Sequence, residues 1–85
     1  MNTESQNLIS SSRDLGAIVR AERRRLGLRQ ADLAKIAGTG RRFLSELENG
    51  KPSLEIGKIM LVLNSLSLKL NCGLAAESQT EKMNF

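Results

Sequence analysis

Hydrophobic residues recur at helical spacing along most of the chain. The first such segment begins after Ser11 or Ser12, where Ser11 and Asp14 approximate a capping box, and it ends near Gly27. The positions expected to face inward are Leu15, Ile18, Val19 and Leu26. The opposite face carries Arg13, Arg20, Arg24 and Arg25. This pattern predicts an amphipathic helix with a basic outer surface.

Three shorter helices are predicted after the first. The second covers about residues 30–37, and the third runs from about 41 to 48 and ends at Asn49 and Gly50. A tight turn over 38–40 joins them, because its two glycines tolerate positive φ. A fourth helix is expected to have Ser53 as its cap and Glu55 in its first turn. The apolar positions are Leu33, Ile36 and Ala37 in the second helix and Leu54, Ile59, Val62, Leu63 and Leu66 in the fourth.

The hydrophobic period changes after the fourth helix. Residues 66–72 alternate between apolar and polar side chains, which is typical of a strand. In an otherwise helical chain such a strand needs a partner, and the simplest partner is the same segment of a second copy. We therefore expect a dimerisation strand over 67–74. Its apolar contacts would come from Leu66, Leu68, Leu70 and Cys72. A continued helix is the alternative, since Leu63, Leu66 and Leu70 also match helical spacing.

The pattern predicts one small domain with two polar ends. Residues 12–66 form the domain, and residues 1–11 and 75–85 lack periodicity and are expected to be mobile. The start of the chain has no signal-peptide pattern, and the longest apolar stretch, 59–63, is too short to span a membrane. We expect a cytoplasmic protein that does not enter a membrane.

The side-chain inventory argues against catalysis and against a cofactor. The chain has no His and a single cysteine, Cys72, so a transition-metal site, a His-based catalytic group and an internal disulfide are out of reach. No set of Ser, Lys or carboxylate residues is marked out for chemistry. We predict no enzyme activity, no catalytic residue, no metal and no cofactor. The only aromatic residues, Phe43 and Phe85, are too few for a protein that stacks single-stranded bases.

Positive charge is concentrated in the middle of the chain. The net charge is +4, but the segment 13–51 carries ten basic and five acidic residues and is therefore +5. Eight of the thirteen basic residues are arginines, which suit phosphate and guanine better than lysine does. On composition alone, a solvated basic face is the plainer explanation.

One carboxylate falls on the inward face of the third helix. Glu48 follows Leu44 by four residues and so lies on the core side. A buried carboxylate needs a charged, hydrogen-bonded partner, and Arg23 occupies the inner edge of the first helix. We predict an Arg23–Glu48 ion pair that joins the two helices. The alternative is that both are half-exposed surface charges.

Two helices joined by a short glycine-containing turn form a helix-turn-helix, whose second helix enters the DNA major groove. Arg41 and Arg42 stand at the N-terminus of that helix, where arginine can read guanine O6 and N7. Gln30, at the start of the preceding helix, and Lys51, after the third helix, are placed for phosphates. Phe43 either touches a thymine methyl or packs inward.

The segment from Leu26 to Lys51 resembles the Cro/cI-type helix-turn-helix of phage repressors. The elements Gln-x-x-Leu-Ala, Gly and Leu-Ser-x-x-Glu-x-Gly occur in order and at the right spacing, and the resemblance covers about residues 13–66. It implies an all-α, lambda-repressor-like domain of four to five helices that binds palindromic double-stranded DNA as a homodimer. It also implies that Arg23–Glu48 is the buried pair. The DNA contacts it suggests are Arg29, Gln30, Arg41, Arg42, Phe43, Ser45, Glu46, Asn49 and Lys51. The sequence departs from the family at Arg29 and Gly40, where capping Thr, Asn or Ser residues often stand.

The C-terminal part is similar to HipB-type antitoxins, which are encoded beside HipA-type kinase toxins. The similarity rests on residues 63–71 and on a polar tail that ends in Phe85. It implies that the last strand pairs across the homodimer and that Phe85 contacts a HipA-like kinase toxin. The sequence therefore predicts an antitoxin that represses its own operon, with a stand-alone phage-type or host regulator as the alternative.

Overall fold

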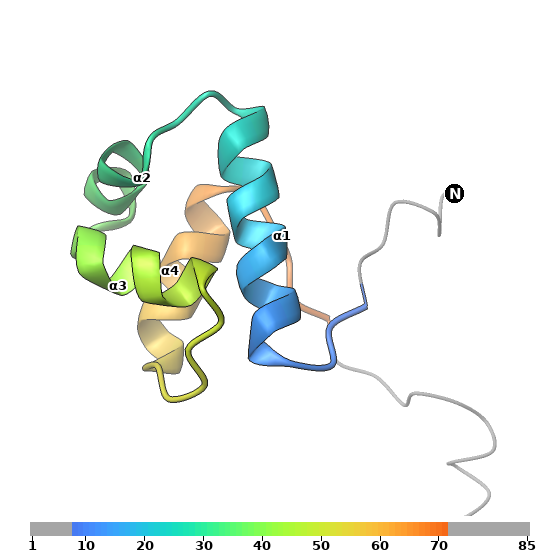
Figure 1. Ribbon diagram of the computed structural model, residues 1–85. Helices are drawn as coiled ribbons and strands as arrows, with labels where there is room; N and C mark the ends of the chain where they lie inside the picture. The colour runs from blue at the N-terminus through green and yellow to red at the C-terminus, as the bar shows by residue number, and fades with distance from the viewer. Residues whose placement is uncertain (1–7, 72–85) are drawn as a thin grey trace, which may run out of the picture.

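The computed structural model describes residues 8–71, which form four helices (Figure 1). Helix α1 spans Ser12–Arg25, α2 spans Gln30–Ala37, α3 spans Arg41–Glu48 and α4 spans Ile56–Ser65. Helix α1 packs against α3, and α2 packs against both α3 and α4. The expected all-α fold is confirmed for this part of the chain, with four helices rather than five.

The four helices enclose a single hydrophobic core. The largest fully enclosed side chains are Val19, Leu33, Leu44 and Val62, and each comes from a different helix. Ala34, Ala37, Leu47, Leu63 and Leu66 complete the buried apolar set. Because every helix supplies one of the central side chains, the position of α3 depends on the packing of the whole domain.

Helix α1 begins where the sequence predicted. Ser11 is the N-cap, and its hydroxyl accepts a hydrogen bond of 3.1 Å from the Asp14 N–H. The Asp14 carboxylate in turn accepts from the N–H and the hydroxyl of Ser10, at 3.0 and 2.9 Å. Leu26 was expected to face inward but is 45% exposed, because it lies at the C-cap, past the last helical turn.

The side chains of α2 that face the core differ from those expected. Ala34 is buried together with Leu33 and Ala37, whereas Ile36, predicted to point inward, is 60% exposed. The helix ends at Gly38, whose φ of +76° allows the Thr39 N–H to donate to the Ala34 carbonyl at 2.9 Å. At the start of α2 the Asp32 carboxylate accepts from the backbone N–H of Arg29 at 2.9 Å.

Helix α4 begins later than the sequence suggested. Its first residue is Ile56, and Glu55 is the N-cap residue with an extended backbone, so Ser53 does not cap the helix and Glu55 does not lie in its first turn. Leu54 packs against the core. Residues 52 and 53 form a bend, and residues 54 and 55 precede the first turn of the helix.

No strand is found among residues 8–71. Leu66 is the C-cap of α4 and is only 3% exposed, because its side chain lies in the core. Ser67 then adopts a φ of +59°, and the Leu68 N–H donates to the Leu63 carbonyl at 2.8 Å. The apparent alternation therefore combines the end of a helix with the turn after it. The rest of the predicted strand, with Cys72, lies outside the described residues, as do residues 1–7 and the tail with Phe85.

Helices α1 and α3 cross at Gly16, a mid-helix glycine that has no distinguishing signal in the sequence. A Cβ on Gly16 would lie 2.8 Å from the Glu48 carbonyl oxygen and closer still to that of Leu47. The Ser12 hydroxyl also donates to the Gly50 carbonyl, at 2.8 Å. This close approach brings the C-terminal turn of α3 against α1 and aligns Glu48 with its partners.

Candidate nucleic-acid interface

The site is organised around Glu48, whose side chain has no exposure to solvent. Its carboxylate accepts from Arg23 Nε at 2.6 Å and from Arg23 Nη2 at 3.0 Å. The remaining edge of the guanidinium donates from Nη1 to the Leu28 carbonyl at 2.7 Å. The ion pair predicted from the helical spacing is therefore present, buried and bidentate.

Two further donors reach the same carboxylate, and neither contact was predicted from the sequence. Gln30 Nε2 lies 3.1 Å and Arg20 Nε lies 3.4 Å from Glu48 Oε1. Burial raises the pKa of the Glu48 carboxyl, but hydrogen bonds from Arg23 and Gln30 lower it more, so the pKa lies below its ordinary value. Glu48 is therefore ionised at neutral pH and ties α3 to α1 and to the first residue of α2.

The outer face of α3 presents a group of charged side chains. Arg41 and Arg42 are exposed at its N-terminus, and the Arg42 side chain is 92% exposed. Glu46 Oε2 lies 3.5 Å from Arg42 Nε and 3.4 Å from Lys51 Nζ. Of the other predicted contacts, Ser45 is half-buried and Asn49 is exposed.

At the N-terminus of α2, the predicted contacts are partly occupied within the chain. The guanidinium of Arg29 binds the Asp32 carboxylate through Nε and Nη2, both at 3.1 Å, although the Arg29 side chain is 84% exposed. Gln30 donates to Glu48, as described above. Phe43 packs against the core with Lys58 Nζ 5.9 Å from its ring centroid, which favours the packing interpretation of that residue.

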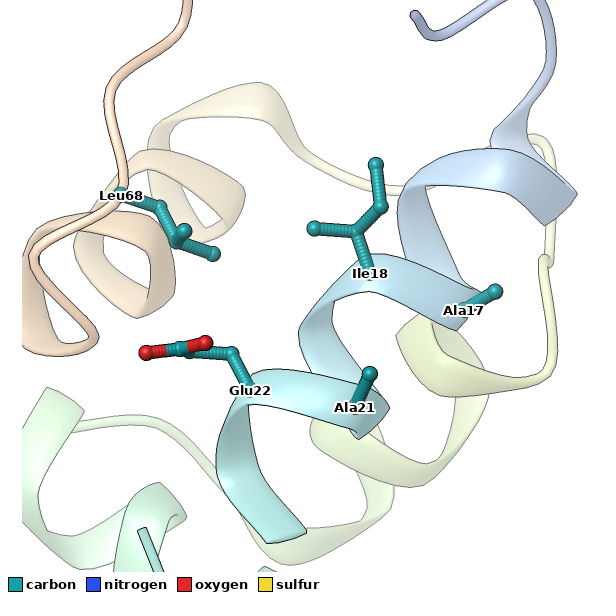
Figure 2. Close-up of a pocket in the computed structure, with 5 residues that line it drawn as sticks. All are labelled: Ala17, Ile18, Ala21, Glu22 and Leu68. Atoms are coloured by element: carbon teal, nitrogen blue, oxygen red, sulfur yellow. The ribbon is translucent and has the colours of Figure 1, made fainter. Parts of the chain in front are cut away.

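A separate hollow of about 290 Å³ lies between α1 and the segment after α4 (Figure 2). Figure 2 shows Leu68 facing Ile18 and Glu22 across this hollow. The other lining residues are Ala17 and Ala21, so the lining is apolar apart from one carboxylate and includes no predicted DNA contact.

Within residues 8–71, no group of His, Cys, Asp or Glu is arranged to hold a metal ion. No helix in the same range is long and apolar enough to cross a membrane.

The fold and the exposed α3 define a helix-turn-helix transcriptional regulator. A family model described as "Helix-turn-helix" matches residues 19–71, more than half of the chain, and the chain belongs to this family. The Cro/cI-type resemblance read from the sequence is thereby confirmed. Members of this class bind DNA and regulate transcription without enzymatic activity.

Among individual relatives, an HTH-type transcriptional regulator, y4mF, of Sinorhizobium fredii (strain NBRC 101917 / NGR234) is 44% identical over 63 residues, which cover 74% of this chain and 83% of the relative. The solved complex of a HipB variant with an O2 20mer is similar with a TM-score of 0.77 and 28% identity, covering 85% of this chain and 100% of that one. A HipA-HipB-O2-O3 complex gives a TM-score of 0.77 at 24% identity, over 84% of this chain and 100% of that one, which shows a shared fold alone.

Proposed function

We propose that this regulator is a repressor that binds a palindromic operator sequence-specifically as a homodimer. The observation that supports it most is the contrast between the two faces of α3. Its inner face is fixed by Glu48 and by buried Leu44 and Leu47, while Arg41 and Arg42 are exposed to solvent at its N-terminus. A recognition element needs such a rigid support, because a misplaced arginine loses its bidentate geometry on guanine.

The proposed mechanism uses one α3 helix per half-site. Two copies of α3 lie in successive major grooves about 34 Å apart, so the operator carries two half-sites one helical turn apart. Arg41 and Arg42 read guanine edges, and Ser45 and Asn49 face neighbouring bases. Lys51 and the N-terminus of α2 bind phosphates on either side, and Arg29 exchanges Asp32 for a phosphate. Such a protein acts in the cytoplasm, where the DNA is.

For dimerisation we retain the pairing of residues 67–74 between two copies, with the paired strand starting after Ser67, whose φ of +59° belongs to the turn that follows α4. Leu66 cannot contribute to this interface, because its side chain is buried in its own chain. Leu68 is half-buried and Leu70 is 42% exposed, so the apolar contacts would come from these residues and from Cys72, whose structure is not described. Pairing of two strands removes an exposed edge from each copy.

We further propose that the protein is an antitoxin that binds a HipA-like kinase through its C-terminal tail, with Phe85 as an anchor. The support is the likeness of fold to HipB over the whole of the HipB chain. The other candidate, a stand-alone regulator, is favoured by the higher identity to a relative that is named only as a transcriptional regulator.

The repressor proposal is tested by measuring the affinity for the DNA upstream of the protein's own gene and for random duplex over a salt series. We expect a preference of about a thousandfold or more for the upstream DNA, with one dimer bound per palindrome. Equal and steeply salt-dependent binding to both duplexes would refute sequence-specific repression.

The antitoxin proposal is tested by co-expression of the full chain with a HipA-like kinase encoded beside it, followed by size-exclusion chromatography. A complex that survives purification, and that Phe85→Ala weakens while operator binding is unchanged, supports the antitoxin. If no complex forms with a folded kinase, the stand-alone regulator is the correct description.

A further inference from the structure

One acidic side chain lies among the cations that α3 presents to solvent. Glu46 Oε2 is 3.5 Å from Arg42 Nε and 3.4 Å from Lys51 Nζ. The backbone reinforces this arrangement, because the Lys51 N–H donates to the Glu46 carbonyl at 3.0 Å and so holds Lys51 beside the carboxylate. Glu46 therefore contacts both a base-reading candidate and a phosphate-binding candidate.

The electrostatic effect of this carboxylate on DNA opposes that of its neighbours. A phosphate or the acceptor-rich edge of guanine near α3 is repelled by Glu46 within the screening length, which is about 10 Å at 0.1 M salt. In addition, Glu46 competes with DNA for Arg42 and Lys51, because its Oε2 lies 3.5 Å from Arg42 Nε and 3.4 Å from Lys51 Nζ. A nonspecific duplex offers phosphates but no matched base edge that could replace Glu46 at Arg42. The carboxylate of Glu46 therefore weakens binding to nonspecific DNA more than binding to the operator.

We propose that Glu46 is a specificity-determining residue of α3, whose carboxylate restrains Arg42 and Lys51 on nonspecific DNA. The restraint is released at the operator, where guanine O6 and N7 replace Glu46 at Arg42 and a phosphate replaces it at Lys51. This inference rests on the proposed repressor function. It gives Glu46 a repulsive role, in contrast to the direct DNA contact expected from the sequence.

A purely structural role for Glu46 does not fit its surroundings. Exposed ion pairs of this kind contribute little to stability. The Arg42 side chain is 92% exposed and the Lys51 side chain 46% exposed, so neither cation is buried by its contact with Glu46. Helix α3 is held instead by Leu44, Leu47 and Glu48. Glu46→Gln should therefore fold normally.

The test is the affinity of full-length Glu46→Gln for random duplex and for the operator at several salt concentrations. We expect the affinity for random duplex to rise severalfold. The slope of log Kobs against log salt should also steepen by about 0.9, because the freed Lys51 neutralises one more phosphate. At the operator Lys51 is already bound to phosphate, so the operator slope stays constant and the ratio of operator to random affinity falls.

The matched control is Glu22→Gln, which makes the same charge change on α1. Glu22 pairs with Arg25 and lines the hollow in Figure 2, whose lining includes none of the predicted DNA contacts. This control should leave both slopes and the affinity ratio near the wild-type values. In the Lys51→Ala background, Glu46→Gln should no longer steepen the slope on random duplex.

Three results would overturn the inference: a proportional loss of affinity for both duplexes in Glu46→Gln, unchanged random-duplex binding, or an equal effect of Glu22→Gln. The first would mean that Glu46 supports the DNA-binding surface as a whole and does not set the preference between the two duplexes. Failure of the repressor proposal is recognised separately, since the wild-type protein would then prefer no duplex. The slope of Glu46→Gln on random duplex would still decide whether the carboxylate restrains Lys51.

Discussion

Replacing Glu48 by glutamine removes the charge at the centre of the domain and keeps nearly the same volume. Arg23 then keeps its place between α1 and α3 with a buried guanidinium that has lost its carboxylate partner. Removing one partner of a buried pair typically costs about 3–5 kcal/mol. Because the glutamine oxygen still accepts one hydrogen bond, we expect a loss near the lower end, about 3 kcal/mol.

A loss of that size is large for this chain. A domain of this length is stable by roughly 4–13 kcal/mol. With a urea m-value of about 1 kcal/mol/M, the unfolding midpoint of Glu48→Gln should fall by about 3 M, or the variant should be unfolded without urea. Circular dichroism during urea unfolding measures this directly. Glu22→Gln, which removes a half-buried carboxylate whose partner Arg25 is 67% exposed, should cost less than about 1 kcal/mol.

The difference in stability between wild type and Glu48→Gln should depend on pH. The folded-state pKa of Glu48 lies below the ordinary value of 4.5, because the hydrogen bonds from Arg23 and Gln30 outweigh the effect of burial. A lowered pKa contributes stability above the unfolded-state pKa, and this contribution is lost as the pH falls through the folded-state pKa. The difference in unfolding free energy between wild type and Glu48→Gln should therefore be constant from pH 7 to about 4.5 and shrink below it. A difference under about 1 kcal/mol at pH 7, or one that grows below pH 4.5, would refute the assigned role of Glu48.

Further expectations concern the helix crossing, the end of α4 and base recognition. Gly16→Ala should destabilise the domain by about 1–3 kcal/mol in urea unfolding, because its Cβ would meet the Glu48 carbonyl oxygen at 2.8 Å. Gly57→Ala, where a Cβ meets nothing within 4 Å, should stabilise by up to about 1 kcal/mol; equal effects of the two would show that the crossing is not tight. Ser67→Gly should raise or preserve the unfolding midpoint, because Ser67 has a φ of +59°, and a clear loss would contradict that backbone conformation. Arg42→Ala should relax selection from random DNA at one base per half-site, costing roughly 1–3 kcal/mol at the operator; an unchanged selected motif would exclude Arg42 as a base contact.

The parts of the fold that the sequence predicted well are those governed by short-range rules. The boundaries of α2 and α3 follow from glycines that stop helices, and the Arg23–Glu48 pair follows from helical spacing together with the cost of burying a lone charge. Neither inference needs knowledge of how the helices are arranged. The helix-turn-helix family match agrees with this local reading.

The errors arise where tertiary packing chooses between local alternatives. Helix α2 is apolar on several sides, so the sequence could not show that Ala34 rather than Ile36 faces the core. The sequence around Leu66 is compatible with an alternating strand and with the end of a helix. The structure has the helix end, because this places the Leu66 side chain in the core. Gly16 gives no signal as a mid-helix residue, because its importance comes from the carbonyl groups of another helix.

Contacts within the candidate site also depend on tertiary packing that the sequence does not reveal. The sequence placed Gln30 and Glu48 in separate roles, one at the DNA and one in the core, yet Gln30 Nε2 donates to Glu48 at 3.1 Å. Arg20, assigned to the outer surface, reaches the same carboxylate. These contacts depend on how α1 and α2 pack against α3, which no local pattern encodes.

Base reading by α3 can be measured as chemical protection of guanine N7 in the operator, since N7 lies in the major groove, where Arg41 and Arg42 are expected to bind. The wild-type protein should protect guanines in two clusters one helical turn apart, and Arg42→Ala should lose protection at one guanine in each cluster. Protection of the sugar–phosphate backbone with every guanine N7 still reactive would contradict the account, because α3 would then lie outside the major groove or bind without reading bases.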